Sequence, residues 1–159
     1  MQTEGYARAL FEGHVPMLDE DAIEDSIDAR LSRQKILTKR PMVDFSFVIG
    51  EAALRQELGG PEVMREQYRH LLDLGALRNV AIQVVPIGRA FHPGLNGGMV
   101  MVETEERQQF GYFESQGIGH VVSDSKHVST FALRYGKLRS QALKVEESGA
   151  FIRNLAGKR

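Results

Sequence analysis

The sequence predicts an α+β domain with a small mixed or antiparallel sheet of about four to five strands, packed by several helices. Three patterns indicate this class: helical periodicity near both ends, short β-branched and aromatic runs between them, and glycine or proline at the junctions. The length of 159 residues is typical of one domain. We therefore expect a single domain over residues 1–159, with a helical part at about 1–40 and an α/β part at about 41–159.

The helical part predicts two helices. Thr3 precedes a short apolar run at 6–11 and is expected to cap a helix there with its hydroxyl. Asp19 is expected to cap a longer helix, from about Glu20 to Thr38, in which isoleucine and leucine recur every four residues. The solvent face of this helix is predicted to carry Asp21, Glu24, Asp25, Asp28, Arg30 and Arg33.

The centre of the chain alternates between strand-like and helix-like sequence patterns. Residues 45–49 and 80–85 are rich in β-branched and apolar residues and predict strands. Between them, residues 51–58 predict one or two helical turns, and Pro61 predicts the start of a longer helix, because proline has no N–H to leave unpaired there. Gly75 is expected to end that helix in the left-handed conformation.

The last third predicts an antiparallel meander followed by two helices. Strands are expected at about 98–103, 109–115 and 120–122. Asp124 or Ser125 is expected to cap a helix that runs to about residue 142, and a last helix is expected at about 145–155. The inward side chains of the first of these helices are predicted to be Val128, Phe131, Ala132, Tyr135, Leu138 and Leu143.

The charge composition narrows the classes of function that we expect for this chain. Twenty Lys and Arg against twenty-one Asp and Glu give a net charge of −1, whereas domains that contact DNA phosphates usually gather a basic excess on one face. We interpret both basic clusters as solvated helix faces. They comprise Arg30, Arg33, Lys35, Lys39 and Arg40 in the first case, and Arg134, Lys137, Arg139 and Lys144 in the second.

The chain contains no cysteine, which excludes disulfides, cysteine-zinc sites and thiol nucleophiles. The first residues lack the pattern of a signal peptide, and the apolar runs fall far short of the ~20 residues of a membrane helix. We therefore expect a cytoplasmic protein with no membrane partner.

Motifs for catalysis or cofactors are not found. The histidines form neither H-x-x-x-H nor H-E-x-x-H, so no metal is expected. No G-x-S-x-G is present, and the glycines of residues 94–98 lack the Lys-Ser/Thr end of a phosphate loop. We assign no catalytic residue and no cofactor. The lack of these motifs favours a protein that is not an enzyme. The histidines are His14, His70, His92, His120 and His127.

The loop after residue 86 is the first candidate for ligand binding. Arg89 could hold an anion, Phe91 is an aromatic residue in a loop, and histidine, the residue at position 92, is the side-chain type whose charge ordinarily changes near neutral pH. Functional residues often lie on such loops. In the alternative interpretation, Phe91 and Leu95 fold back onto the sheet edge, and His92 caps a backbone group.

A second candidate lies on the aromatic strand at 109–115. Because side chains alternate along a strand, Tyr112 and Glu114 share one face, where they could line a pocket. An exposed edge carboxylate is the alternative for Glu114. Tyr68, on the long central helix, completes the predicted ligand-binding set with Arg89, Phe91 and His92.

An ordered string of segments resembles a known family over nearly the whole chain. The resemblance is to the C-terminal domain of XRE-type helix-turn-helix regulators from filamentous, antibiotic-producing bacteria, catalogued as domain of unknown function 5753 and described as Scr1-family antitoxin-like. The segments are QTEGYARAL (2–10), FVIGEAALR (47–55), GGPEVM (59–64), LLDL (71–74), NVAIQVVP (79–86) and HPG (92–94).

The resemblance implies a sensing or effector domain whose ligand is a small molecule or a small partner protein, often encoded nearby. In this family a helix-turn-helix precedes the segment that matches residues 2–8, so DNA contact is expected only through that missing N-terminal domain. The family has no established catalytic residues.

Two further hypotheses stay open at this stage. The chain could be a stand-alone relative recruited as a cyclase-like enzyme in secondary metabolism, where shape and a few polar groups suffice. It could instead be a dimerisation or docking module, with a homodimer among its assemblies. Gene context separates the regulator from the enzyme, and ligand-induced shifts in melting temperature test for a pocket.

Overall fold

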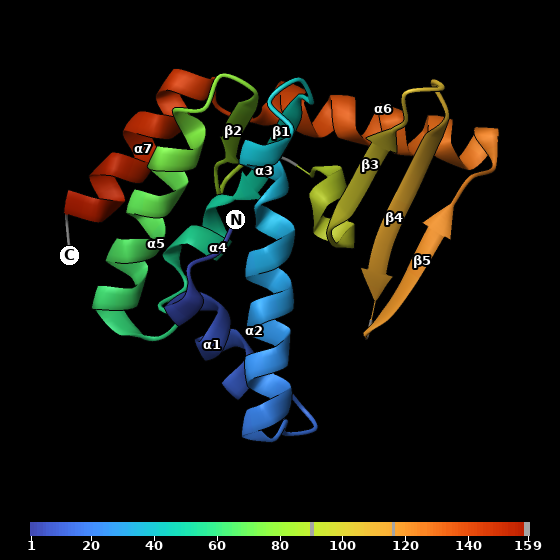
Figure 1. Ribbon diagram of the computed structural model, residues 1–159. Helices are drawn as coiled ribbons and strands as arrows, with labels where there is room; N and C mark the ends of the chain where they lie inside the picture. Colours follow the sequence, from blue (N-terminus) through green and yellow to red (C-terminus); the bar gives the residue numbers. More distant parts are fainter. Residues whose placement is uncertain (90, 116, 158–159) are drawn as a thin grey trace. The chain divides into compact units, whose positions relative to one another are not determined.

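A computed structural model describes residues 1–89, 91–115 and 117–157 (Figure 1). The chain divides into two compact units. The first unit comprises residues 1–84 and 143–159, and the second comprises residues 85–142. The predicted α+β class is confirmed, and the predicted four to five strands are divided between a two-stranded and a three-stranded sheet.

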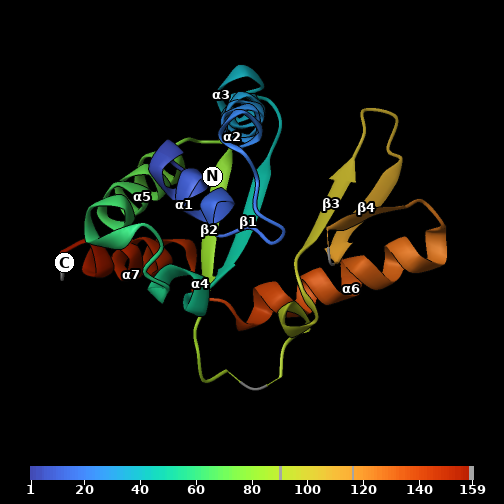
Figure 2. The ribbon, with the colours of Figure 1, turned by 90° about the horizontal axis from the view of Figure 1, so that it is seen from below.

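The first unit is built around a parallel pair of strands, β1 and β2. Parallel neighbours need a crossover connection, which α4 and α5 provide. Helices α5 and α7 lie side by side (Figures 1 and 2). In chain order the elements are α1 (Glu4–Glu12), α2 (Glu20–Gln34), α3 (Ile36–Lys39), β1 (Phe45–Gly50), α4 (Glu51–Arg55), α5 (Gly60–Gly75), β2 (Val80–Val85) and α7 (Val145–Gly157).

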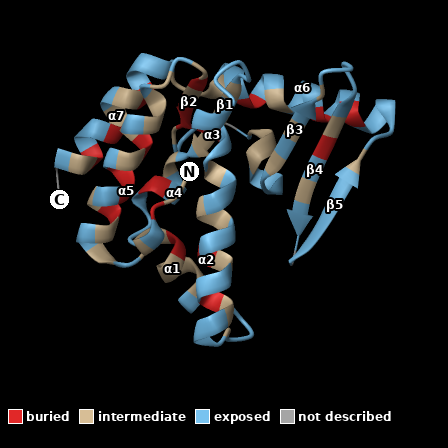
Figure 3. Ribbon diagram, in the orientation of Figure 1, coloured by how far each residue is buried: buried red, intermediate tan, exposed pale blue. Residues whose placement is uncertain are grey.

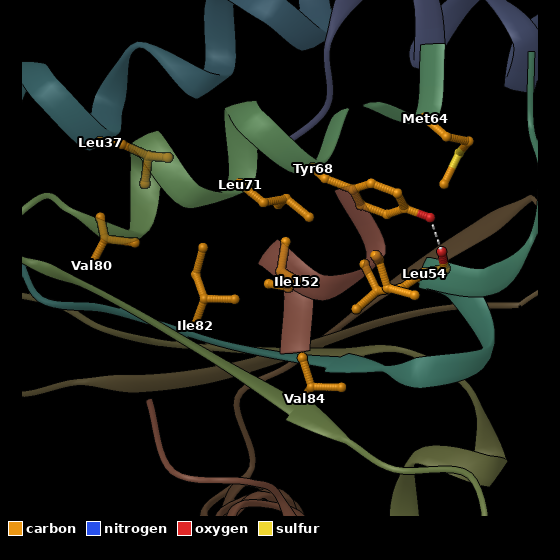
Figure 4. Packing of buried hydrophobic residues seen from close by; sticks show 10 residues of the cluster. Leu37, Leu54, Met64, Tyr68, Leu71, Val80, Ile82, Val84 and Ile152 are labelled. Carbon is orange, nitrogen blue, oxygen red and sulfur yellow. Dashed lines mark hydrogen bonds between the residues drawn. The ribbon is translucent and has the colours of Figure 1, made fainter. Parts of the chain in front are cut away.

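The core of this unit is centred on α5 (Figure 4). Met64 and Tyr68 are fully buried, and the Tyr68 hydroxyl donates a hydrogen bond to the Leu54 carbonyl oxygen at 2.5 Å. Buried polar side chains join the surrounding elements to this core. Gln67 accepts from the Thr3 backbone N–H at 2.8 Å, and the Ser148 hydroxyl accepts from the Val84 N–H at 3.0 Å. Both bonds link segments far apart in the sequence.

The predicted N-caps are confirmed. The Thr3 hydroxyl accepts from the Tyr6 N–H, and the Asp19 carboxylate accepts from the Ala22 N–H at 2.8 Å. The predicted helix from about Glu20 to Thr38 is wrong in one respect, because it is interrupted at Lys35. There the Lys35 N–H bonds to the carbonyl three residues earlier, at 3.2 Å, which tightens the turn and separates α2 from α3.

Arg30 does not belong to the predicted solvent face of α2. Its guanidinium carbon lies 4.4 Å from the centroid of the Phe11 ring, and the group donates to the Gln2 side-chain oxygen at 2.5 Å. A guanidinium can stack on an aromatic ring while it hydrogen-bonds in its own plane, so it is suited to a partly buried position. Here Arg30 joins α2 to α1.

The prediction for Gly75 is also wrong. Gly75 is the last residue of α5, and the cap is Ala76 with right-handed angles of φ −82° and ψ −12°. The Ala76 N–H bonds to the Leu72 carbonyl at 3.1 Å, and the Leu77 N–H bonds to the Leu74 carbonyl. Right-handed turns therefore carry the chain out of the helix, so no left-handed residue is needed.

The second unit confirms the predicted meander. Its strands are antiparallel in the order β3-β4-β5, and β5 begins two residues earlier than expected. Gln116, which lies between the second and third predicted strands, is outside the described residues. Asp124 is the observed cap of the following helix, and it accepts from the His127 N–H at 3.1 Å. The elements are η1 (Pro93–Asn96), β3 (Met99–Glu103), β4 (Gln109–Ser115), β5 (Ile118–Val122) and α6 (Ser125–Gln141).

One face of this sheet packs against α6 (Figure 2). The rings of Phe113 and Phe131 are 6.1 Å apart, and a Cβ at Gly111 would lie only 3.1 Å from the Phe131 ring. Of the inward residues predicted for α6, Val128, Phe131 and Leu138 are buried and Tyr135 is half-buried, whereas Leu143 lies beyond the end of the helix and packs in the core of the first unit. Ala132 is exposed, which corrects the prediction, because it is rotated by one residue from Phe131 toward solvent.

Candidate functional site

The sheet face opposite to α6 carries the predicted pair Tyr112 and Glu114. The register sets Tyr112 opposite Val100 on β3 and Val121 on β5, so these three side chains share that face. We call it the open sheet face. It comprises Val100, Val102, Phe110, Tyr112, Glu114, Gly119 and Val121.

The open sheet face is apolar and exposed. Tyr112 is 37% exposed, Val100 51%, Val102 53% and Val121 73%. A solvent-facing side of an antiparallel sheet normally carries polar residues, because exposed apolar surface is unfavourable in water. A group of exposed apolar side chains beside one another is typical of a surface that binds a partner.

The polar side-chain groups of this face, the Tyr112 hydroxyl and the Glu114 carboxylate, are hydrogen-bonded to each other. The Tyr112 hydroxyl donates to the Glu114 carboxylate at 3.2 Å. Burial raises the pKa of the Tyr112 hydroxyl, and the Glu114 carboxylate adds to this rise because it stabilises the protonated form. Gly119 leaves room for the ring, since a Cβ there would lie 2.6 Å from the hydroxyl oxygen. The predicted shared face is confirmed, and Glu114 is exposed on it.

The loop candidates lie elsewhere in the second unit. Arg89 is exposed, and Phe91 is 71% exposed, so Phe91 does not fold onto the sheet edge as the alternative interpretation expected. Leu95 is 65% exposed and departs from that interpretation in the same way. These side chains are available to a ligand, and η1, which contains Leu95 and follows Arg89 and Phe91, contacts α6.

His92 contributes a polar atom without a partner. Its Nδ1 is buried and has no hydrogen bond to any described residue, so it does not cap a backbone group. Gln141, at the end of α6, donates to the Phe91 carbonyl at 3.4 Å, and its buried Oε1 likewise has no partner among the described residues. Buried polar atoms are usually paired, so two orphans near the loop keep His92 a candidate binding residue.

Tyr68 is separated from the other candidates. It belongs to the first unit, has no exposed surface, and directs its hydroxyl to the Leu54 carbonyl (Figure 4). In this structure it contributes core packing and offers nothing to a surface ligand. The predicted set is thus divided into a core residue, a loop group and the Tyr112–Glu114 pair.

Valines 100, 102 and 121 were not among the predicted site residues. The sequence at 99–102, Met-Val-Met-Val, is apolar on both faces of the strand, and this pattern could have drawn attention to the valines. Such a strand is expected to be covered on both faces. The sequence pattern did not show that α6 covers only one of them.

Among the described residues, no group of three or more His, Asp or Glu side chains could hold a metal ion. In the described part of the chain, a shallow groove runs along α2 and α3 and another along the outer side of α6, and neither is lined by a predicted ligand-binding residue. No helix in the described part of the chain is both long and apolar enough to cross a membrane.

The fold and the site define an α+β protein whose second unit carries an exposed apolar sheet face. A family model described as "Domain of unknown function (DUF5753)" matches residues 1–154. The chain therefore belongs to this family. No curated protein and no solved structure matches it.

Proposed function

We propose that this chain is the sensing domain of a bacterial transcription regulator and that its effector is a small protein bound on the open sheet face. The observation that carries the proposal is the exposure of Val100, Val102 and Val121 beside Tyr112. The family resemblance supports the regulatory role, since such domains follow a helix-turn-helix and have partners encoded nearby.

The chemistry of the face defines the expected partner. Its centre is aliphatic and aromatic, so the partner should present apolar side chains there. Glu114 is the one formal charge on the face, and its carboxylate already accepts from the Tyr112 hydroxyl. A partner lysine or arginine opposite Glu114 would add a charge-assisted hydrogen bond and fix the orientation of the complex.

The test uses the purified products of reading frames adjacent to the gene as probes, titrated calorimetrically against the chain. We expect Val121→Asp to weaken binding of the cognate product at least tenfold, because it places a charge in an apolar interface. The matched control is Ile118→Asp, which is 61% exposed on the same strand but on the opposite face. This control should bind like the unmodified chain, and both variants should keep its melting temperature.

Two results would overturn the proposal. If His92→Ala abolishes binding of the product while Val121→Asp does not, the loop is the binding site. If none of the products binds, and a small metabolite raises the melting temperature instead, the effector is a small molecule.

A further inference from the structure

The solvent side of α2 and α3 carries two blocks of opposite charge. The acidic block consists of Asp21, Asp25 and Asp28, and the basic block of Arg33, Lys35, Lys39 and Arg40. All seven side chains are exposed. None of them forms a hydrogen bond or ion pair with another described residue.

The helix macrodipole accounts for Arg33 and Lys39, which lie in the last turns of α2 and α3, but not for the whole arrangement. Acidic residues are favoured in the first turn of a helix, which explains Asp21, but the effect fades beyond that turn, whereas Asp25 and Asp28 lie in the middle of α2. The spacing is also unfavourable within one helix. Asp21 and Asp25 are four residues apart, and Lys35 and Lys39 are likewise four apart, so like charges lie next to each other.

A seam of small and apolar residues begins between the blocks and continues into the basic block. Ala29, Ser32 and Ile36 follow one another at helical spacing and line a shallow groove with the basic block. Ile36 is 48% exposed. The seam offers apolar contact, while the charges that border it have no partner within the described chain.

We propose that two copies of this chain associate through this face, with α2 of one copy antiparallel to α2 of the other. A two-fold axis near Ala29 brings Asp25 of one copy opposite Lys35 of the other, and Asp21 opposite Lys39. Such an interface uses the same patch twice and must be self-complementary, as this patch is. A parallel arrangement would oppose like charges. The acidic block would also repel a nucleic-acid backbone, which disfavours DNA as the occupant.

The association concerns the first unit and does not depend on the function proposed for the open sheet face. Two helices make a small interface, so we expect a dimer that depends on protein concentration and on salt. Sedimentation velocity should detect dimers at about 0.05 M NaCl and mostly monomers at about 0.5 M, because salt screens exposed charges.

Charge exchange tests the pairing directly. Asp25→Lys with Asp28→Lys, and separately Arg33→Glu with Lys35→Glu, should each weaken dimerisation at least tenfold. Mixing the two variants should produce a heterodimer, and combining all four substitutions in one chain should restore the homodimer. The control, Arg69→Glu with Arg134→Glu, changes exposed charges elsewhere and should leave the dimer unchanged.

A second measurement does not depend on whether the charge variants fold. The chain has no cysteine, so Ala29→Cys introduces a single thiol near the proposed axis. Oxidation at low salt should give covalent dimers, whereas Ala132→Cys, exposed on α6, should not. Equal crosslinking of both variants, failure of the mixed variants to pair, or binding of a DNA duplex that Arg33→Glu abolishes would each overturn the proposal.

Discussion

The two units use their apolar residues differently (Figure 3). In the first unit the buried apolar side chains gather in two clusters, a larger one that joins α5, α7 and both strands and a smaller one between α1 and α2. In the second unit buried side chains lie mainly along α6, while valines on β3 and β5 stay exposed. Burial of apolar surface stabilises a fold, whereas apolar surface that stays exposed can stabilise a complex when a partner covers it. The first unit therefore holds most of the buried apolar residues, whereas the second leaves an apolar sheet face exposed.

The largest expected effect tests the core. Met64→Ala should lower the free energy of unfolding by about 2–5 kcal/mol, because it removes a fully buried side chain and leaves a cavity. Val102→Ala, on the open sheet face, should change it by about 0.5 kcal/mol or less. Urea unfolding measures both values. A comparable loss for the two variants would mean that the face is part of the stabilising core.

A smaller effect tests the contact between α6 and its sheet. Gly111→Ala should cost about 1–3 kcal/mol, because the added methyl group would lie 3.1 Å from the Phe131 ring. Gly98→Ala is the matched control, since nothing lies within 4 Å of the added atom there. Hydrogen exchange of β4 amides should increase only in the first variant. Unchanged exchange would show that the ring moves aside without cost.

The smallest expected effect is a loss of stability at acidic pH. Burial lowers the pKa of His70 on α5, although Asp73 and Glu66 partly oppose this shift. The unfolded chain therefore binds the proton more readily. The stability contributed by the neutral ring is complete above the unfolded pKa of about 6.5, and it is lost as the pH falls through the lower folded pKa.

Melting temperatures at about pH 7.5 and about pH 5.5 provide the measurement. The decrease on acidification should be smaller in His70→Gln, which keeps a polar group but does not titrate in this range. The extra acid sensitivity of the unmodified chain should show as faster hydrogen exchange in α5, with β4 unaffected. If acid loosens β4 instead, the sensitivity belongs to the second unit.

Local chemistry explains which elements could be predicted. Thr3, Asp19 and Asp124 cap their helices as expected, because capping depends on a side chain and an N–H within the same turn. The shared face of Tyr112 and Glu114 follows from strand alternation alone. For Arg30 the error came because a distant contact decides the outcome. Arg30 turns inward because Phe11 and Gln2 lie beside it.

The sequence by itself determined the class of the fold, the helix N-caps, and most strand and helix positions, because periodicity and N-capping are local properties. Only the tertiary structure decided that the strands divide between two sheets and that α6 covers one face of β3-β4-β5. It also placed Tyr68 in the core and left Val121 exposed. A distant helix decides which face of an apolar strand is covered. The residues of the strand do not indicate that face when both of its faces are apolar.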